Sequence, residues 1–264
     1  PTNNLNHIIV DNLNRKWIAT NCNGLVMIDE VAWNIYNTSN SSIPSDCLMS
    51  LAADNNSNLW VGGSFDNFNL AKYDGINWTV WNSTNSPMVL DYVSSIAVDS
   101  SNKIWLISNN PINFGTANEL FSFDGDTIWN YELGFMSVDG YRKLIISGDS
   151  IITGTTTFIG KLLVLKSDGS NYEIGNFDGL YISDLKQDNL GNIWVAAGTG
   201  SWGYLAMYNG TSFVSYPYEA MSIEIDEENN VWIGIGPGWD NDTTKLIKYD
   251  GTNWTEFTAA NSPL

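Results

Sequence analysis

The sequence is short of basic residues, histidine and cysteine. Its 264 residues include 11 Lys and Arg, one His and two Cys, against 29 Asp and Glu. The resulting formal charge of −18 would repel the phosphates of nucleic acids and the anionic head groups of lipids. We therefore expect no nucleic-acid partner, whereas cationic ligands and uncharged sugars remain open.

Long apolar runs are also missing. A membrane helix needs about 20 apolar residues, and the most apolar stretches, such as 144–152, are interrupted by Ser, Gly and Asp. We expect no membrane insertion. In contrast, the chain is 43% hydrophobic and has 12 Trp and 12 Tyr, which is ample material for a packed core and excludes a disordered chain.

One sequence frame repeats with a period of about 40–45 residues. In five copies an Asp precedes a Trp by six residues, with turn-forming residues between them. Each pair predicts a β-hairpin that joins a first to a second strand, with the Asp capping the turn and the Trp packing between neighbouring units. The pairs are Asp11 and Trp17, Asp54 and Trp60, Asp99 and Trp105, Asp188 and Trp194, and Asp226 and Trp232.

After each Trp the frame continues with small residues, a variable loop and a third strand. In four copies this strand ends in Asp-Gly or Asn-Gly, at 74–75, 124–125, 209–210 and 250–251, whereas the first copy has Asp29-Glu30 there. Such dipeptides favour a type I′ turn, so a fourth strand should follow at once. A copy without the Trp, over about 143–170, brings the count to six. The sequence thus predicts an all-β fold, a six-bladed β-propeller with four antiparallel strands per blade.

We expect one domain over residues 1–264. The approximate blades are 1–43, 44–88, 89–133, 134–176, 177–217 and 218–264. Residues 261–264 followed by 1–11 match 40–54 in length and in phase. We therefore expect the blades to close into a ring, in preference to an open ring or a slice of a longer array.

The frame I-x-x-D-x-x-G/N-N-x-W-I/V-G/A resembles the two-component regulator propeller repeat. The best matches are 192–197 and 230–234, and Gly24-Leu25 also fits. The resemblance implies a bacterial extracytoplasmic propeller, as found in sensor domains of membrane-bound hybrid histidine kinases and in secreted surface proteins. The sequence contains no kinase. It is also similar to the six-bladed streptogramin lyases, but with His7 as its only histidine no His-centred site can be transferred.

Few residues offer catalytic chemistry. Triads with Ser or Cys need an imidazole beside the nucleophile, and we interpret His7 as structural. Two Cys and one His have no zinc-ligand spacing, so we expect no metal and no cofactor. The string 198–203 fits G-x-G-x-x-G, but a strand follows it and no helix N-terminus is there to hold phosphate. A glycosidase would need two carboxylates about 5–10 Å apart; the candidates are Asp66, Glu119, Asp240 and Asp242.

The loops between the second and third strands form the predicted binding site. In a propeller these loops emerge on one face, here called the loop face, and nearly all of them carry aromatics among Asn, Asp and Gly. Such residues suit stacking on sugar rings with polar contacts around the ring. The alternative is that some of them pack beneath their own loops. The predicted ligand-binding residues are Phe65, Phe68, Phe114, Phe158, Trp202, Tyr204, Trp239 and Asp240.

The two cysteines fall in segments that should share this face. Cys22 lies in the second-to-third strand loop of the first copy, and Cys47 lies in the connection to the second copy. We expect a disulfide, with free thiols as the alternative. It would stabilise the fold by about 3 kcal/mol and would fit an exported protein.

Together these features predict a non-catalytic extracytoplasmic propeller that acts as a monomer and binds a glycan or another protein on its loop face. The alternatives are a sensor-domain fragment of a two-component regulator, a lyase or glycosidase, and a purely structural surface repeat.

Overall fold

A computed structural model describes most of the chain. The described residues are 5–29, 32–63, 70–82, 84–86, 93–109, 118–131, 143–154, 159–178, 180–198, 203–235, 245–258 and 260–262. They form 24 strands in six antiparallel sheets, each of four strands in chain order, and contain no helix. The fold is a six-bladed β-propeller with four strands per blade. Across these same residues no helix is long and apolar enough to cross a membrane.

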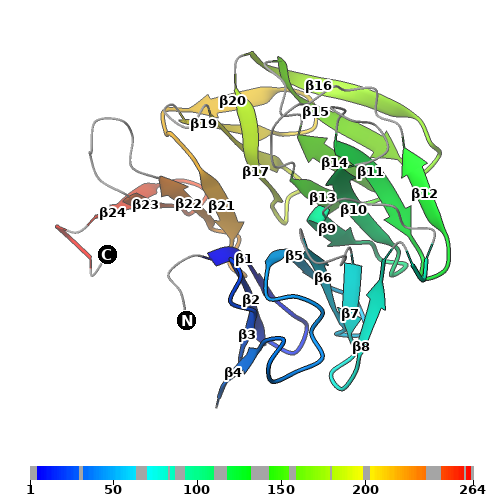
Figure 1. Cartoon of the computed structure of the whole chain (residues 1–264). Coiled ribbons are helices and arrows are strands. Elements are labelled where there is room, and N and C mark those ends of the chain that lie inside the picture. The colour runs from blue at the N-terminus through cyan, green and yellow to red at the C-terminus, as the bar shows by residue number, and fades with distance from the viewer. Residues whose placement is uncertain are drawn as a thin grey trace. The chain divides into compact units, whose positions relative to one another are not determined.

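The described residues group into two compact units, Pro1–Val138 and Asp139–Leu264. The first unit holds blades 1 to 3, coloured blue to green in Figure 1. Its strands are β1 (Leu5–Val10), β2 (Lys16–Thr20), β3 (Leu25–Ile28) and β4 (Trp33–Tyr36) in blade 1; β5 (Leu48–Ala53), β6 (Leu59–Gly63), β7 (Leu70–Tyr73) and β8 (Trp78–Trp81) in blade 2; and β9 (Val93–Val98), β10 (Ile104–Asn109), β11 (Asn118–Phe123) and β12 (Ile128–Tyr131) in blade 3.

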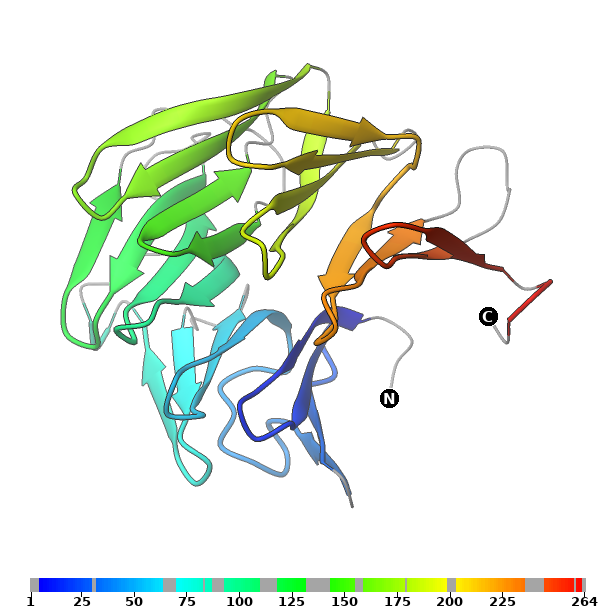
Figure 2. The same ribbon diagram turned by 180° about the vertical axis from the view of Figure 1, so that it is seen from behind.

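The second unit holds blades 4 to 6, each a sheet of four strands; blade 6 is coloured orange to red in Figure 2. Blade 4 has no Asp–Trp pair, and its last strand runs past the expected boundary at 176. The strands are β13 (Leu144–Ser147), β14 (Ser150–Gly154), β15 (Ile159–Lys166) and β16 (Asn171–Asp178) in blade 4; β17 (Tyr181–Gln187), β18 (Ile193–Gly198), β19 (Gly203–Tyr208) and β20 (Phe213–Tyr216) in blade 5; and β21 (Ser222–Ile225), β22 (Val231–Ile235), β23 (Lys245–Tyr249) and β24 (Trp254–Phe257) in blade 6.

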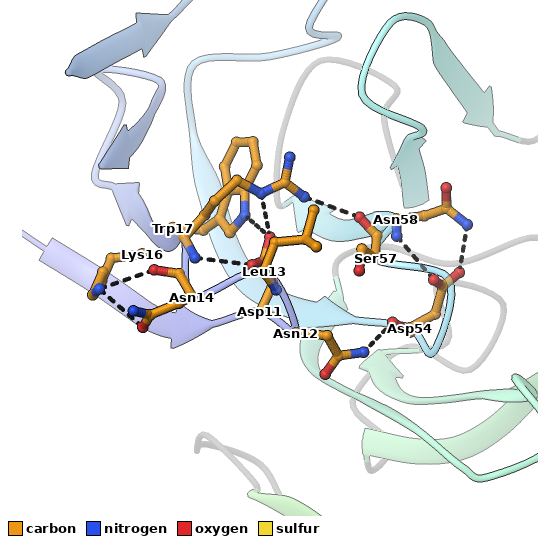
Figure 3. Close-up of polar contacts among 10 residues, drawn as sticks. Asp11, Asn12, Leu13, Asn14, Lys16, Trp17, Asp54, Ser57 and Asn58 are labelled. Atoms are coloured by element: carbon orange, nitrogen blue, oxygen red, sulfur yellow. Dashed lines mark hydrogen bonds and ion pairs between the residues drawn. The ribbon is translucent and has the colours of Figure 1, made fainter. Parts of the chain in front are cut away.

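Each Asp–Trp pair is a hydrogen-bonded clasp across the hairpin between the first two strands. In blade 1 the Trp17 indole N–H donates to Asp11 Oδ2 at 2.8 Å, and the backbone N–H groups of Leu13 and Arg15 donate to Oδ1 (Figure 3). The Asp therefore caps the turn while its Trp enters the core. In the other four blades that carry the pair, the indole-to-carboxylate distances are 3.1 Å (Trp60), 2.9 Å (Trp105), 3.0 Å (Trp194) and 2.8 Å (Trp232).

The clasp changes the acidity of its carboxylate. Burial alone raises the pKa of Asp11, but the hydrogen bonds from Trp17 and Arg15 outweigh it and hold the pKa below the ordinary value of 3.8. The pKa values of Asp99 and Asp226 are lowered in the same way, against the effect of burial. These groups are thus ionised structural acids.

Neighbouring blades within a unit pack through apolar clusters, three of which contain a clasp Trp. Trp17 is 1% exposed and joins one cluster with Leu25 of blade 1 and Leu51 and Val61 of blade 2. The ring of Tyr73 from blade 2 meets Trp17 edge-on at 6.1 Å. Similar clusters join blades 2 and 3, blades 4 and 5, and blades 5 and 6. Burial of these large side chains is the main stabilising term between blades.

Close approach of the next blade explains why the second strands of blades 2 and 4 end in glycine. A Cβ built at Gly154 would lie 2.4 Å from the Ile182 Cβ on β17, and one at Gly62 would lie 2.8 Å from the Val93 Cγ1 on β9. Real Cβ contacts are not this short, so larger residues would push the strands apart.

Candidate functional site

The loop face begins in blade 1 with residues 21–24, which connect β2 to β3. Its other described part in this blade is the connector from β4 to β5. There Asn37 N–H donates to Asn40 Oδ1 at 2.9 Å, Asn40 Nδ2 donates back to Ile35 O at 2.9 Å, and Ser41 Oγ donates to Asn37 O. The same three bonds recur after β8, around Asn85, and after β24, around Asn261. This polar turn was not anticipated from the sequence, although the Asn-Ser pair that forms it recurs there.

A disulfide joins the loop of blade 1 to this connector. Cys22 and Cys47 are bonded with an S–S distance of 2.06 Å. Gly24 N–H also donates to Asp46 O at 2.8 Å, and Asp46 Oδ1 accepts from Thr38 N–H at 2.7 Å. The loop and the connector are thus held together at two points, and the Thr38–Asp46 bond orders the connector itself; this limits the freedom they would lose on contact with a ligand.

The first strands of successive blades are linked near the loop face by one repeated position, four residues before the clasp Asp. In blade 1 this is His7, whose Nδ1 accepts the Leu51 N–H of β5 at 2.9 Å. In blade 5 it is Asp184, whose Oδ2 accepts the Ile223 N–H of β21 at 2.9 Å. In blade 2 it is Ser50, whose hydroxyl donates to Val93 O at 3.1 Å. We call these residues the interblade links.

A β-bulge precedes each interblade link. The pairing of the first and second strands shifts between Leu5 and His7, between Leu48 and Ser50, and between Ile182 and Asp184. Bulges re-aim side chains and bend the strand. They were missed in the sequence because neither Gly nor Pro marks them; the only signal was their constant spacing before the clasp Asp.

In blade 5 the interblade link is a buried carboxylate. Asp184 is 8% exposed, and the Lys143 Nζ, just before β13, lies 4.0 Å from its Oδ1. The Leu185 N–H donates to the same oxygen at 3.0 Å. One cation and two backbone donors therefore compensate the buried carboxylate.

Of the aromatic residues predicted to bind ligand, Tyr204 is described. Its ring meets Phe177 of β16 at 5.8 Å, and it packs against the cluster shared by blades 4 and 5. Its hydroxyl is hydrogen-bonded to Ser215 Oγ. Tyr204 thus lies on β19 and packs against the preceding blade, rather than beneath its own loop. The other predicted ligand-binding residues, Phe65, Phe68, Phe114, Phe158, Trp202, Trp239 and Asp240, lie outside the described residues and stay predictions.

Blade 6 adds an ionisable group beside this face. Tyr218 lies in the connector from β20 to β21, with its ring 4.6 Å from that of Trp254. Burial, and then the charge of Glu256, raise the pKa of Tyr218 above its usual 10. The Glu256 Oε2 lies 3.6 Å from the Lys245 Nζ. Tyr218 is therefore a neutral hydroxyl at physiological pH, suited to hydrogen bonding.

Catalytic groups are scarce in the part of the chain that the structure describes. The one imidazole is used as a hydrogen-bond acceptor between β1 and β5. Within the described residues no three His, Cys, Asp or Glu side chains gather as metal ligands. Of the four carboxylates considered for glycoside hydrolysis, Asp66, Asp240 and Asp242 lie outside the described residues, as does the side chain of Glu119.

Comparisons with known proteins support the fold. The chain matches no protein-family model and no curated protein. Among solved structures it is similar to the extracellular domain of BT4673 from B. thetaiotaomicron, described as a one component and as a hybrid two component system. That match has a TM-score of 0.68 and 16% identity, over 92% of this chain and 32% of that one.

Two other solved structures have different functions. Virginiamycin B lyase from Staphylococcus aureus matches with a TM-score of 0.72 and 12% identity, over 96% of this chain and 84% of the lyase. PorZ, a surface component of the type-IX secretion system of Porphyromonas gingivalis, matches with a TM-score of 0.75 and 13% identity, over 99% of this chain and 42% of PorZ. The neighbours thus include extracellular and surface proteins as well as an enzyme, and at these identities they share the fold alone.

Proposed function

We propose that this chain is a non-catalytic extracytoplasmic propeller that binds a glycan or a protein, as a monomer, through its loop face. The observation that carries the proposal is the Cys22–Cys47 disulfide, which fixes a loop and a connector of that face to each other. Disulfides persist in oxidising compartments outside the cytoplasm. Two of the structural neighbours are an extracellular domain and a surface component, which supports the same location.

The binding role rests on how the described groups are used. His7 accepts a hydrogen bond between two strands, and Asp184 is compensated by Lys143 and backbone donors, so both side chains have structural roles. The remaining polar groups of blade 1 at this face, Asn21, Asn23 and Ser42, are exposed and suited to hydrogen bonding with hydroxyl groups or a peptide backbone.

A sensor domain is the second candidate. The repeat resembles the two-component regulator propeller repeat, and the extracellular domain of BT4673 matches nearly all of this chain. The match covers 32% of that domain, so the chain would correspond to one part of a larger receptor. Ligand binding at the loop face is common to both candidates.

A glycan array probed with the purified protein tests the proposal. A specific hit should lose binding when Trp202 or Trp239 is replaced by Ala, whereas Tyr204→Phe, which keeps the ring beside Phe177, should leave it unchanged. Binding to no glycan, together with no protein partner lost on these replacements, would contradict the proposal.

A further inference from the structure

The blades can be compared with one another at one row of cross-strand neighbours that recurs in five of them. In five blades the clasp Trp on the second strand pairs with a residue on the third strand, which pairs with one on the fourth. Four of these rows end in a small or polar residue or Val. The rows are Trp17, Met27 and Asn34; Trp60, Lys72 and Thr79; Trp105, Ser122 and Trp129; Trp194, Met207 and Val214; and Trp232, Lys248 and Thr255.

Blade 3 departs from this pattern by ending its row in a second indole. Trp129 is 40% exposed, although it occupies a position that other blades fill with Asn, Thr or Val. Its neighbour Ser122 is completely buried and small. Trp129 belongs to none of the four interblade clusters formed by the described residues. The fold therefore does not need an indole at this position.

The Trp129 ring is held in place from one side. The Lys103 Nζ lies 4.5 Å from its centroid and 5.1 Å from that of Trp105, so the ammonium bridges the two indoles. Cation–π contacts of this kind contribute about 0.5–1 kcal/mol at exposed sites. A ring that is already oriented loses little freedom when a ligand stacks on it.

The surroundings of Trp129 suit a small polar ligand better than a protein. The hairpin before it carries Asp124, Asp126 and Thr127, and Asp124 Oδ1 accepts the N–H groups of the other two. A protein interface buries about 800 Å² per partner around an apolar centre. Here one exposed indole follows a hairpin that carries two carboxylates and a hydroxyl, a combination that suits the C–H face and hydroxyl rim of a sugar ring.

The charged groups near Trp129 disfavour charged sugars. The Lys103 ammonium already occupies one side of the indole and disfavours a second cation on the same ring. The carboxylates of Asp124 and Asp126, and the net charge of −18, disfavour an anion. We propose that Trp129, oriented by Lys103, is a stacking platform for a neutral saccharide ring and forms a second binding site on this chain.

This platform is separate from the loop face. Trp129 follows the hairpin that joins β11 to β12, whereas the loop from β10 to β11 leaves blade 3 at the opposite end of β11. The platform is therefore testable without disturbing the loop face, and either site can fail without the other.

Affinity electrophoresis of the whole chain tests the platform, with native gels that contain laminarin, xyloglucan or galactomannan. We expect at least one of these neutral polysaccharides to retard the protein, and Trp129→Thr, the residue at 79 and 255, to weaken binding about tenfold or more. Trp129→Tyr should retain part of the retardation. Trp33→Thr removes a Trp that is 68% exposed on β4, and as a matched control it should stay within about twofold of wild type.

Three results would overturn the proposal. They are a wild type that no neutral polysaccharide retards, a Trp129→Thr variant that binds like wild type, and a Trp33→Thr variant that loses as much. Retardation by polygalacturonate that depends on Trp129, without retardation by the neutral polymers, would show that the ligand class is wrong. Thermal melts of each variant verify that it is folded, and Trp202→Ala or Trp239→Ala should not alter binding at Trp129.

Discussion

Removing the clasp carboxylate of blade 5 should cost far more stability than its place in a surface turn suggests. Asp188 is 7% exposed and accepts four hydrogen bonds. Its Oδ1 accepts the N–H groups of Leu190 and Asn192, and its Oδ2 accepts Asn192 Nδ2 and the indole N–H of Trp194. Asp188→Ala leaves all four donors without this partner.

The four donors differ in how easily water can replace the carboxylate. The turn N–H groups can be hydrated, but Trp194 is 1% exposed, so its N–H would stay buried and unpaired. An unpaired buried donor costs about 1–3 kcal/mol, and each bond to a charged group contributes about 1.5–3 kcal/mol. We expect Asp188→Ala to lower the free energy of unfolding by about 3–5 kcal/mol.

Asp188→Asn sharpens the test, because every partner of this carboxylate is a donor. The amide keeps one acceptor oxygen, but its NH2 group then faces two donors, so we expect a loss of about 2–4 kcal/mol. Urea unfolding with an unchanged m-value measures both variants. In a Trp194→Phe background, which lacks the indole N–H, Asp188→Ala should cost about 1–3 kcal/mol less. Losses below about 0.5 kcal/mol for both variants would refute the reasoning.

Three further predictions concern stability at low pH, the interblade link at His7 and the close contact at Gly154. The pKa of Asp11 is lowered in the folded protein, so its carboxylate stabilises the fold fully above the ordinary Asp range. This contribution is lost as the pH falls through the folded-state pKa, which lies below 3.8. Urea midpoints measured between pH 6 and 2.5 should show the loss, and a flat profile would contradict it. His7→Asn keeps an acceptor for the Leu51 N–H and should preserve its protection from hydrogen exchange, whereas His7→Leu should lose it; equal exchange in both variants would be inconsistent with the link. Gly154→Ala places a Cβ against Ile182 and should lower the free energy of unfolding by about 1–3 kcal/mol. Thermal melting measures this, and an unchanged midpoint would contradict the prediction.

The blade architecture was predictable because its determinants are local. The Asp–Trp spacing and the Asp-Gly turns each fix a hairpin within a few residues, and those hairpins define the strands on both sides. The same repetition revealed blade 4 without its Trp. The Asp side chains are turn caps, as predicted, and the clasp adds the indole N–H to the backbone donors.

The interblade links and the Trp129 row depend instead on residues far apart in the sequence. His7 and Leu51 are 44 positions apart, and nothing near either residue indicates that they meet. For Trp129, only the strand register shows that it pairs with Ser122 and lies outside the interblade clusters of the described residues. The position of Tyr204 was not predictable for the same reason, because an aromatic residue at the end of a strand can face either a loop or the preceding blade.

The most direct test of the central claim is hydrogen exchange of the intact, oxidised protein with and without a ligand from the array. We predict slower exchange on binding at residues 21–24 and 199–202 and in the connector 37–47, with the clasp hairpins unchanged. Protection confined to the clasp hairpins, or no protection at saturating ligand, would contradict binding at the loop face.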